Sequence, residues 1–160
     1  MITERLVELI HEAASIRRWN DFAKPVDFVE LDKQGHKMIV AYVLGRFEES
    51  GAERPVNWLA LVEGGIFEFL HRIVLTDIKP HVFHRMMREK GTELNRWVRA
   101  RLKPELEQLP AAFSESFGRY FADPGFARRE KRLLQAAHYL ATQWEFNIIY
   151  KGCPFLYGIE

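Results

Sequence analysis

The chain has 160 residues, of which 48% are hydrophobic and 28% charged, and its formal net charge is +1. This length and composition are typical of one folded domain and exclude a disordered chain. A charge so close to zero argues against a surface built for nucleic acid or for an anionic membrane.

Three further features bound the cellular context. The N-terminal letters MITERLVELIHEAA place charges inside an apolar pattern, so they lack the core of a signal peptide. No run of about 18 uncharged apolar residues occurs, so we expect no membrane-spanning segment. The single cysteine, Cys153, cannot form an intramolecular disulfide and suits a reducing compartment, so we expect a cytoplasmic protein.

Apolar residues recur at helical spacing along most of the chain. The first such segment covers residues 6–13, and residues 15–25 follow as a loop or a broken helix. A second helix is expected over residues 27–49. Its predicted apolar face consists of His36, Val40, Val43, Leu44 and Phe47. Because a helix turns its apolar face to the core, we expect these side chains, the histidine included, to be buried.

Prolines and glycines divide the second half into further helices. The letters SGAERP break the chain, and Pro55 suits the first turn of a third helix that continues to about Leu75. Pro80 can open a short helix that Gly91 ends. Further helices are expected over residues 91–104, 112–121 and 125–150. With no strand pattern in the sequence, we predict an all-α, single-domain bundle of about six helices over residues 1–160.

Three glycines lie inside predicted helices, where each costs about 1 kcal/mol relative to alanine. They are Gly35, Gly64 and Gly65. Small residues let two helix backbones approach, which would bring His36 close to Glu68. The alternative is that these glycines make room for neighbouring aromatic side chains.

Several residues are candidates for chemistry, and each also has a plain structural interpretation. His36 and His138 lie on predicted apolar faces, where a histidine is either a metal ligand or a core residue that hydrogen-bonds to a carbonyl group. Glu68 lies one turn before Arg72 and can form an exposed ion pair with it. His81 and His84 follow Pro80 and are expected to be solvated.

The spacing of Glu68 and His71 matches the Glu-x-x-His motif of carboxylate-bridged di-iron bundles, and so does that of Glu8 and His11. That architecture also requires inward carboxylates on two other helices. The sequence offers no such set, so we interpret both matches as chance.

The order of four segments suggests a family. RRW at 17–19 is followed by ELDKQGHKMIVAYVL, then by EFLHRIVLTDIKP and finally by EKRLLQAAHYLAT. This order, over residues 15–150, resembles the HD-domain phosphohydrolase superfamily, in the branch that is similar to bacterial 5′-deoxynucleotidases.

The resemblance implies a site for one divalent metal ion, which would be zinc, manganese, iron or cobalt. Its ligands would be His36, Glu68 and His138, with His71 able to assist. The family's His-Asp dyad falls on Glu68 and Phe69, and its catalytic glutamate on Arg72, so two carboxylates of the family pattern are missing.

The remaining family positions imply a substrate. Asp77 would position or deprotonate the attacking water. Arg18 would bind a phosphate group through paired hydrogen bonds, and Trp19 would shape the pocket against a sugar or base. The implied partner is a small phosphorylated molecule of the nucleotide class, and neither a nucleic acid nor a membrane.

Two functions remain open at this point. The first is a metal-dependent phosphohydrolase with an altered set of ligands. The second is a degenerate HD-like binding or interaction module that holds no metal, in which Arg72 pairs with Glu68. The resemblance also implies a homodimer, for which Trp97, Phe155 and Tyr157 offer an apolar surface.

Overall fold

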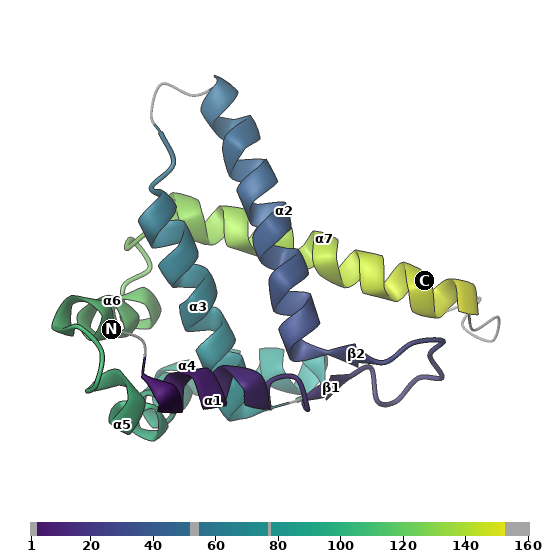
Figure 1. The fold of residues 1–160 in the computed structure, drawn as a ribbon, viewed down its shortest axis with the longest axis horizontal. Coiled ribbons are helices and arrows are strands. Elements are labelled where there is room, and N and C mark those ends of the chain that lie inside the picture. Colours follow the sequence, from purple (N-terminus) through teal and green to yellow (C-terminus); the bar gives the residue numbers. More distant parts are fainter. Residues whose placement is uncertain (1–2, 52–54, 77, 153–160) are drawn as a thin grey trace.

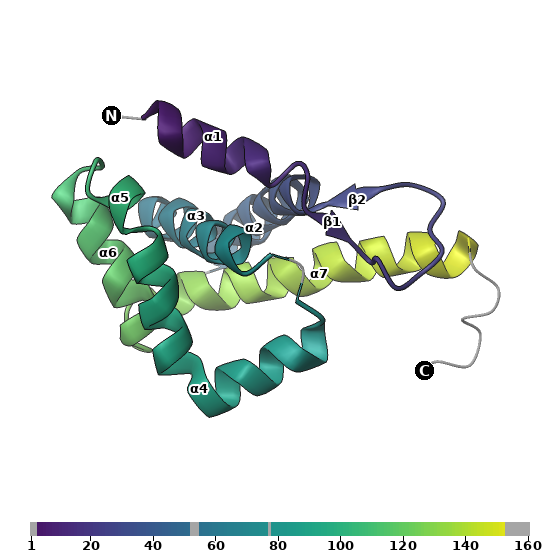
Figure 2. The same cartoon turned by 90° about the horizontal axis from the view of Figure 1, so that it is seen from below.

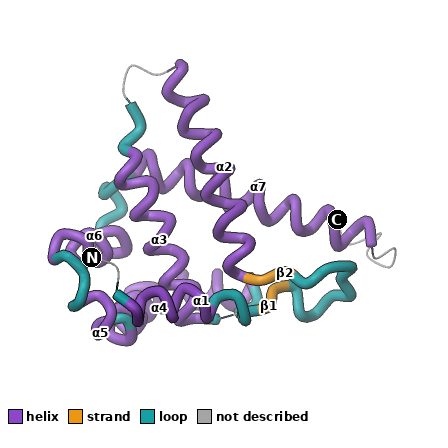
Figure 3. Tube along the Cα trace, viewed as in Figure 1, coloured by secondary structure: helices purple, strands orange, loops and turns teal. Residues whose placement is uncertain are grey.

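The computed structural model describes residues 3–51, 55–76 and 78–152, and this part of the chain is almost entirely helical (Figures 1 and 3). Its elements are, in order, α1 (Glu4–Glu12), β1 (Arg17–Arg18), β2 (Phe28–Val29), α2 (Glu30–Gly51), α3 (Trp58–Leu75), α4 (Pro80–Arg101), α5 (Lys103–Leu106), α6 (Ala111–Ala122) and α7 (Arg128–Gly152). The all-α prediction is therefore confirmed. Within these residues, no helix is both long enough and apolar enough to cross a bilayer.

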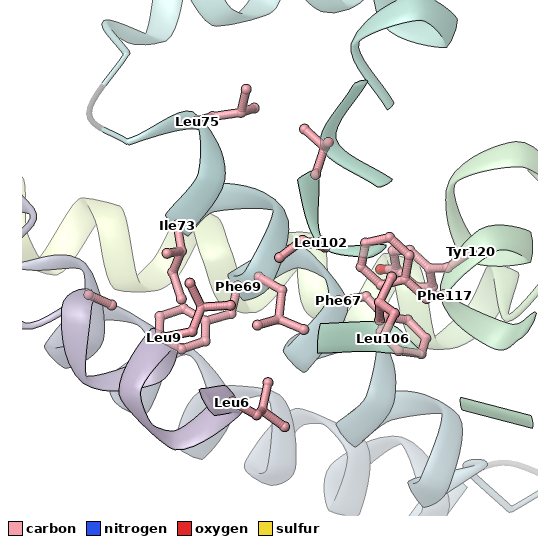
Figure 4. Packing of buried hydrophobic residues seen from close by; sticks show 13 residues of the cluster. Leu6, Leu9, Phe67, Phe69, Ile73, Leu75, Leu102, Leu106, Phe117 and Tyr120 are labelled. Atoms are coloured by element: carbon pink, nitrogen blue, oxygen red, sulfur yellow. The ribbon is translucent and has the colours of Figure 1, made fainter. Parts of the chain in front are cut away.

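Helix α3 lies between two apolar clusters. The larger cluster joins α3 to α1, to the second half of α4, to α5 and to α6, and Figure 4 shows Phe67 and Phe69 of α3 among its side chains. The smaller cluster joins α3 to α2 and α7 through residues such as Leu61, Ala41 and Leu134. Figure 2 shows α1 and α7 on opposite sides of the α2–α3 pair.

Local signals place most helix ends close to where the sequence predicts them. Helix α3 begins at Trp58 because the side chain of Asn57 accepts a hydrogen bond from the backbone of Ala60 at 3.0 Å. Pro80 occupies the first turn of α4, as expected. The predicted boundary between two helices at Gly91 is confirmed to within one residue, because α4 is interrupted by a kink at Lys90, whose φ is −139°, and its second part continues to Arg101.

The loop predicted over residues 15–25 contains a strand. Arg17 pairs with Val29 and Arg18 with Phe28 in an antiparallel ladder. Side chains alternate across a strand, so Arg17 faces solvent while Arg18 faces inward and is 8% exposed. The strand thereby carries a guanidinium into the protein beside the start of α2.

The predicted apolar face of α2 is correct for Val40 and Leu44, which pack against the smaller cluster, and wrong for the other three members. Val43 is 59% exposed and Phe47 is 78% exposed, and His36 is only half-buried. The buried residues of this helix are instead Glu30, Lys33, Lys37, Ala41 and Gly45. They form one stripe at helical spacing, with charged residues in its first half and small residues in its second, and this stripe faces α3 and α7.

The apolar surface predicted for a homodimer lies mostly outside the described residues. Trp97 is 50% exposed, whereas Phe155 and Tyr157 are not among the described residues. The homodimer therefore stays a prediction.

The interior glycines divide into two kinds. A Cβ atom at Gly64 would lie 2.8 Å from Tyr120, and one at Gly65 would lie very close to the sulfur of Met38, so both positions need a small residue. A Cβ atom at Gly35 would meet nothing within 4 Å. Close approach of α2 and α3 is thus confirmed at Gly65, which faces Met38 of α2, whereas Gly64 makes room for the aromatic ring of Tyr120, as the alternative predicted. The expectation for Gly35 is wrong.

Two glycines of α2 give a matched test of this packing. At Gly45 an added methyl group would lie 2.7 Å from the ring of Trp58, which a hydrogen bond of 2.9 Å to Glu49 holds in place. We expect Gly45→Ala to lower the free energy of unfolding by about 1–3 kcal/mol, because overpacking outweighs the gain in helix propensity. Denaturant unfolding followed by circular dichroism measures it.

The control is Gly35→Ala in the same helix. Its methyl group enters open space, so we expect it to raise the free energy of unfolding by up to about 1 kcal/mol. Equal stabilisation by both variants would contradict the tight contact between Gly45 and Trp58.

Candidate functional site

Charged side chains from four elements meet where α2 packs against α3 and α7. We call this group the central ion cluster, and its members are Arg18 of β1, Glu30, Lys33 and Lys37 of α2, Glu68 and Arg72 of α3, and Glu145 of α7. The β1 residue, the three α2 residues and Glu145 are buried. Because buried charges are costly unless they are paired, the partner of each member decides what the cluster can do.

Arg18 and Trp19 both bind the carboxylate of Glu145, which is 2% exposed. The guanidinium donates to Glu145 at 2.9 and 3.2 Å and to Glu30 at 2.7 Å, and the indole of Trp19 donates to Glu145 at 2.8 Å. Burial lowers the pKa of Arg18, but the two carboxylates outweigh it and leave that pKa raised. The two residues predicted to contact substrate are thus engaged by carboxylates of the protein itself.

Glu68 pairs with a lysine rather than with the expected arginine. The ammonium of Lys37 lies 2.7 Å from one oxygen of Glu68, and the hydroxyl group of Tyr120 donates to the other. Burial and the charge of Glu68 raise the pKa of Tyr120, so the hydroxyl keeps its proton and remains a donor. Both oxygens of this carboxylate therefore have partners.

Arg72 contacts other groups. Its guanidinium lies 3.8 Å from Glu30, donates to the backbone oxygen of Ile78 at 3.3 Å and lies 5.6 Å from the ring centre of Phe83. The predicted ion pair between Arg72 and Glu68 is therefore wrong. Lys37 replaces Arg72 because it extends from α2 directly across to Glu68 of the neighbouring helix.

Lys33 is the exception in the cluster. It is 5% exposed, yet within the described residues its ammonium donates no hydrogen bond and has no carboxylate within the 4.0 Å of an ion pair. Burial, and then the charge of Arg18, lower its pKa to about 7, and the more distant carboxylates of Glu30 and Glu145 offset this only in part. A buried ammonium without a partner is unstable relative to the neutral amine.

The cluster is not sealed from solvent. Among the described residues, the side-chain atom that is both inaccessible to solvent and without a hydrogen bond belongs to Glu105. The nitrogen of Lys33 also lacks a hydrogen bond, but it keeps some contact with solvent. His138 of α7 is exposed as a whole residue, but its ring lies within electrostatic range of the cluster. Partial burial and the charges of Lys33 and Lys37, then of Arg18 and Arg72, lower the pKa of His138. The cluster thus borders an exposed, neutral histidine.

The predicted metal ligands have other partners. The ring of His36 contacts Trp144 at 4.8 Å between centres. His71 is buried, lies 3.0 Å from the side-chain oxygen of Asn95, and stacks on Phe121; burial lowers its pKa, so it is held neutral. These contacts make His36 and His71 parts of the packing between helices.

Metal binding by His36, Glu68, His138 and His71 stays a prediction. Glu68 is neutralised by an ammonium, and no group of three or more His, Cys, Asp or Glu residues able to hold a metal occurs among residues 3–51, 55–76 and 78–152. Asp77, the predicted catalytic residue, lies outside the described residues. His81 and His84 are exposed, as predicted.

Comparison with known proteins adds no family assignment. The sequence matches no protein-family model, and it matches none of the curated proteins. The resemblance to HD-domain phosphohydrolases therefore remains a hypothesis that rests on the order of the sequence segments.

Sequence reasoning missed four members of the cluster, which are Glu30, Lys33, Lys37 and Glu145. A signal was present in α2, where the first three lie at helical spacing in line with Ala41 and Gly45. Two small residues on one face indicate that another helix crosses there. The charges in line with them belong to the same buried face.

Replacing Lys33 by methionine should stabilise the protein. Because the pKa of Lys33 falls from 10.5 to about 7 on folding, the unfolded chain binds more protons between those pH values. The parent protein therefore gains stability as the pH rises from about 7 to about 10.5, and the penalty is full below pH 7. We expect Lys33→Met to be more stable at pH 6 by at least about 1.4 kcal/mol, the equivalent of one pKa unit. We also expect that the stability of Lys33→Met does not rise between about pH 7 and about pH 10.5.

Lys37→Met is the matched control, one turn along the same face. It removes the partner of Glu68, so we expect a loss of about 1–2 kcal/mol. Urea unfolding between pH 6 and pH 10 separates the two. A loss of stability in Lys33→Met equal to that in Lys37→Met would show that Lys33 has a partner.

Proposed function

We propose that this chain is a metal-independent binding module that holds a small phosphorylated molecule at the central ion cluster. The observation that carries the proposal is the ammonium of Lys33, which is buried, has no hydrogen-bond or ion-pair partner among the described residues and keeps access to solvent. An anionic ligand beside it would supply the missing partner. The binding energy would come from a charge that the protein has already desolvated.

A phosphate group suits this environment better than a single carboxylate. It carries a charge of about −1.5 to −2 at pH 7 and offers three strong acceptor oxygens. The charges of Arg18 and Arg72 both act on Lys33, and both would favour the same anion. Their guanidinium groups are bound to carboxylates, so we assign the direct contact to Lys33 and a longer-range attraction to the arginines.

The alternative is a metal-dependent phosphohydrolase of the HD type. It would require Glu68 to exchange Lys37 and Tyr120 for a metal ion, and it would require ligands that the described residues do not bring together. These contacts favour the binding module. Trp19, at the edge of the cluster, supports a nucleotide as the phosphorylated ligand, because an indole can stack on a base.

Calorimetry with inorganic phosphate and adenosine 5′-monophosphate tests the proposal. We expect the parent protein to bind both ligands, and treatment with a chelator to leave the affinity unchanged. Lys33→Met should weaken binding at least about tenfold, which corresponds to the loss of one charge-assisted hydrogen bond. The control is Lys90→Met, since Lys90 is exposed on α4 and should not affect binding.

Two outcomes would contradict this function. Absence of binding to either ligand would remove the phosphate site. Hydrolysis of the monophosphate that requires an added divalent metal would favour the phosphohydrolase instead.

A further inference from the structure

Two lysines of α2 differ in one respect. Lys33 and Lys37 are one helical turn apart, are 5% and 4% exposed, and belong to the same cluster. Lys37 donates to Glu68 at 2.7 Å and lies 3.5 Å from the side-chain oxygen of Gln34. Lys33 donates to no group in the described part of the chain, and its nitrogen is not sealed from solvent.

This difference decides which amine can act as a nucleophile. An amine attacks through its lone pair, which is present only in the neutral form. The ammonium of Lys37 is held by a carboxylate. Lys33 instead is largely buried and feels the charges of two guanidinium groups, which is the arrangement that activates a lysine.

We propose that Lys33 is a site of covalent bond formation, where its amine condenses with the carbonyl carbon of a phosphorylated aldehyde or ketone to give an imine. The inference rests on the proposed function, because the positive charge of the cluster must first attract the phosphate group. Lys33 then reacts in those molecules in which its amine is neutral and the charges of Arg18 and Arg72 alone attract the phosphate. The amine nitrogen adds to the carbonyl carbon, and a proton moves from nitrogen to oxygen to give a carbinolamine. Loss of the hydroxyl group with a second proton releases one water molecule and leaves the carbon–nitrogen double bond. No oxidant or reductant is required.

The lowered pKa of Lys33 is consistent with an amine that is buried and has no partner among the described residues. Burial and the charge of Arg18 lower its pKa to about 7, so a large fraction of the amine is neutral at physiological pH. Glu30 and Glu145 accept hydrogen bonds from Arg18, and neither carboxylate lies within 4.0 Å of the Lys33 nitrogen to hold it as an ammonium ion.

Reductive trapping tests the inference. The parent protein is mixed at pH 7.5 with pyridoxal 5′-phosphate, a phosphorylated aldehyde, in less than equimolar amount, and borohydride then converts any imine to a stable secondary amine. Peptide mapping by mass spectrometry locates the label. We expect Lys33 to be labelled at least tenfold more than Lys37, which is the internal control in the same sample. Pyridoxine 5′-phosphate, which lacks the aldehyde, should protect Lys33 by competition.

A variant separates this inference from the proposed function. Lys33→Arg keeps the positive charge but cannot form an imine, so we expect it to retain phosphate binding and to lose the label. Phosphate binding by the parent without labelling of Lys33 would overturn the inference and leave the proposed function standing. Absence of both would overturn both. Should Lys33→Arg not fold, the ratio of label at Lys33 to label at Lys37 in the parent still decides.

Discussion

The close packing of α2 against α3 and α7 places a demand on the rest of the molecule, because the face of α2 that it buries is charged. Glu30, Lys33 and Lys37 enter a region that water largely leaves, so other elements must supply their partners. The strand β1 places Arg18 beside Glu30, and α3 places Glu68 beside Lys37. The carboxylate of Glu145 then joins α7 to Arg18 and Trp19. The hairpin, α2, α3 and α7 are thus held in position by ion pairs as well as by apolar contacts.

Stability alone does not explain this arrangement. Buried ion pairs are often no more stable than apolar side chains of the same size, because desolvation offsets their attraction. An unpartnered lysine is worse still, and the small residues Ala41 and Gly45 show that the same helix face can be packed without charge. A feature that lowers stability while concentrating charge is typical of a binding or reactive site. This reasoning, rather than a family assignment, connects Lys33 to a phosphorylated ligand.

The sequence predicted the helices better than it predicted their faces. The hydrophobic periodicity and the positions of proline and glycine locate α3, the start of α4 at Pro80 and the long α7, because these signals are local. The inner face of α2 could not be predicted by the same logic, which assigns apolar residues to the core, because the partners of Glu30 and Lys37 are distant in the sequence. Arg18, Glu68 and His138 were predicted as site residues and do lie in or beside the cluster. The predicted partner of Glu68 was wrong, because the sequence alone does not show that Lys37 lies closer to it than Arg72 does.

The proposed site depends on the burial of Lys33 in the central ion cluster without a hydrogen-bond or ion-pair partner among the described residues. Nuclear magnetic resonance of protein with isotope-labelled lysine side chains, assigned with Lys33→Arg, measures its titration directly. The account predicts a midpoint near pH 7 for the Lys33 amine in the free protein, and a higher midpoint when inorganic phosphate is present. A midpoint near the ordinary lysine value of about 10.4 that does not respond to phosphate would contradict it.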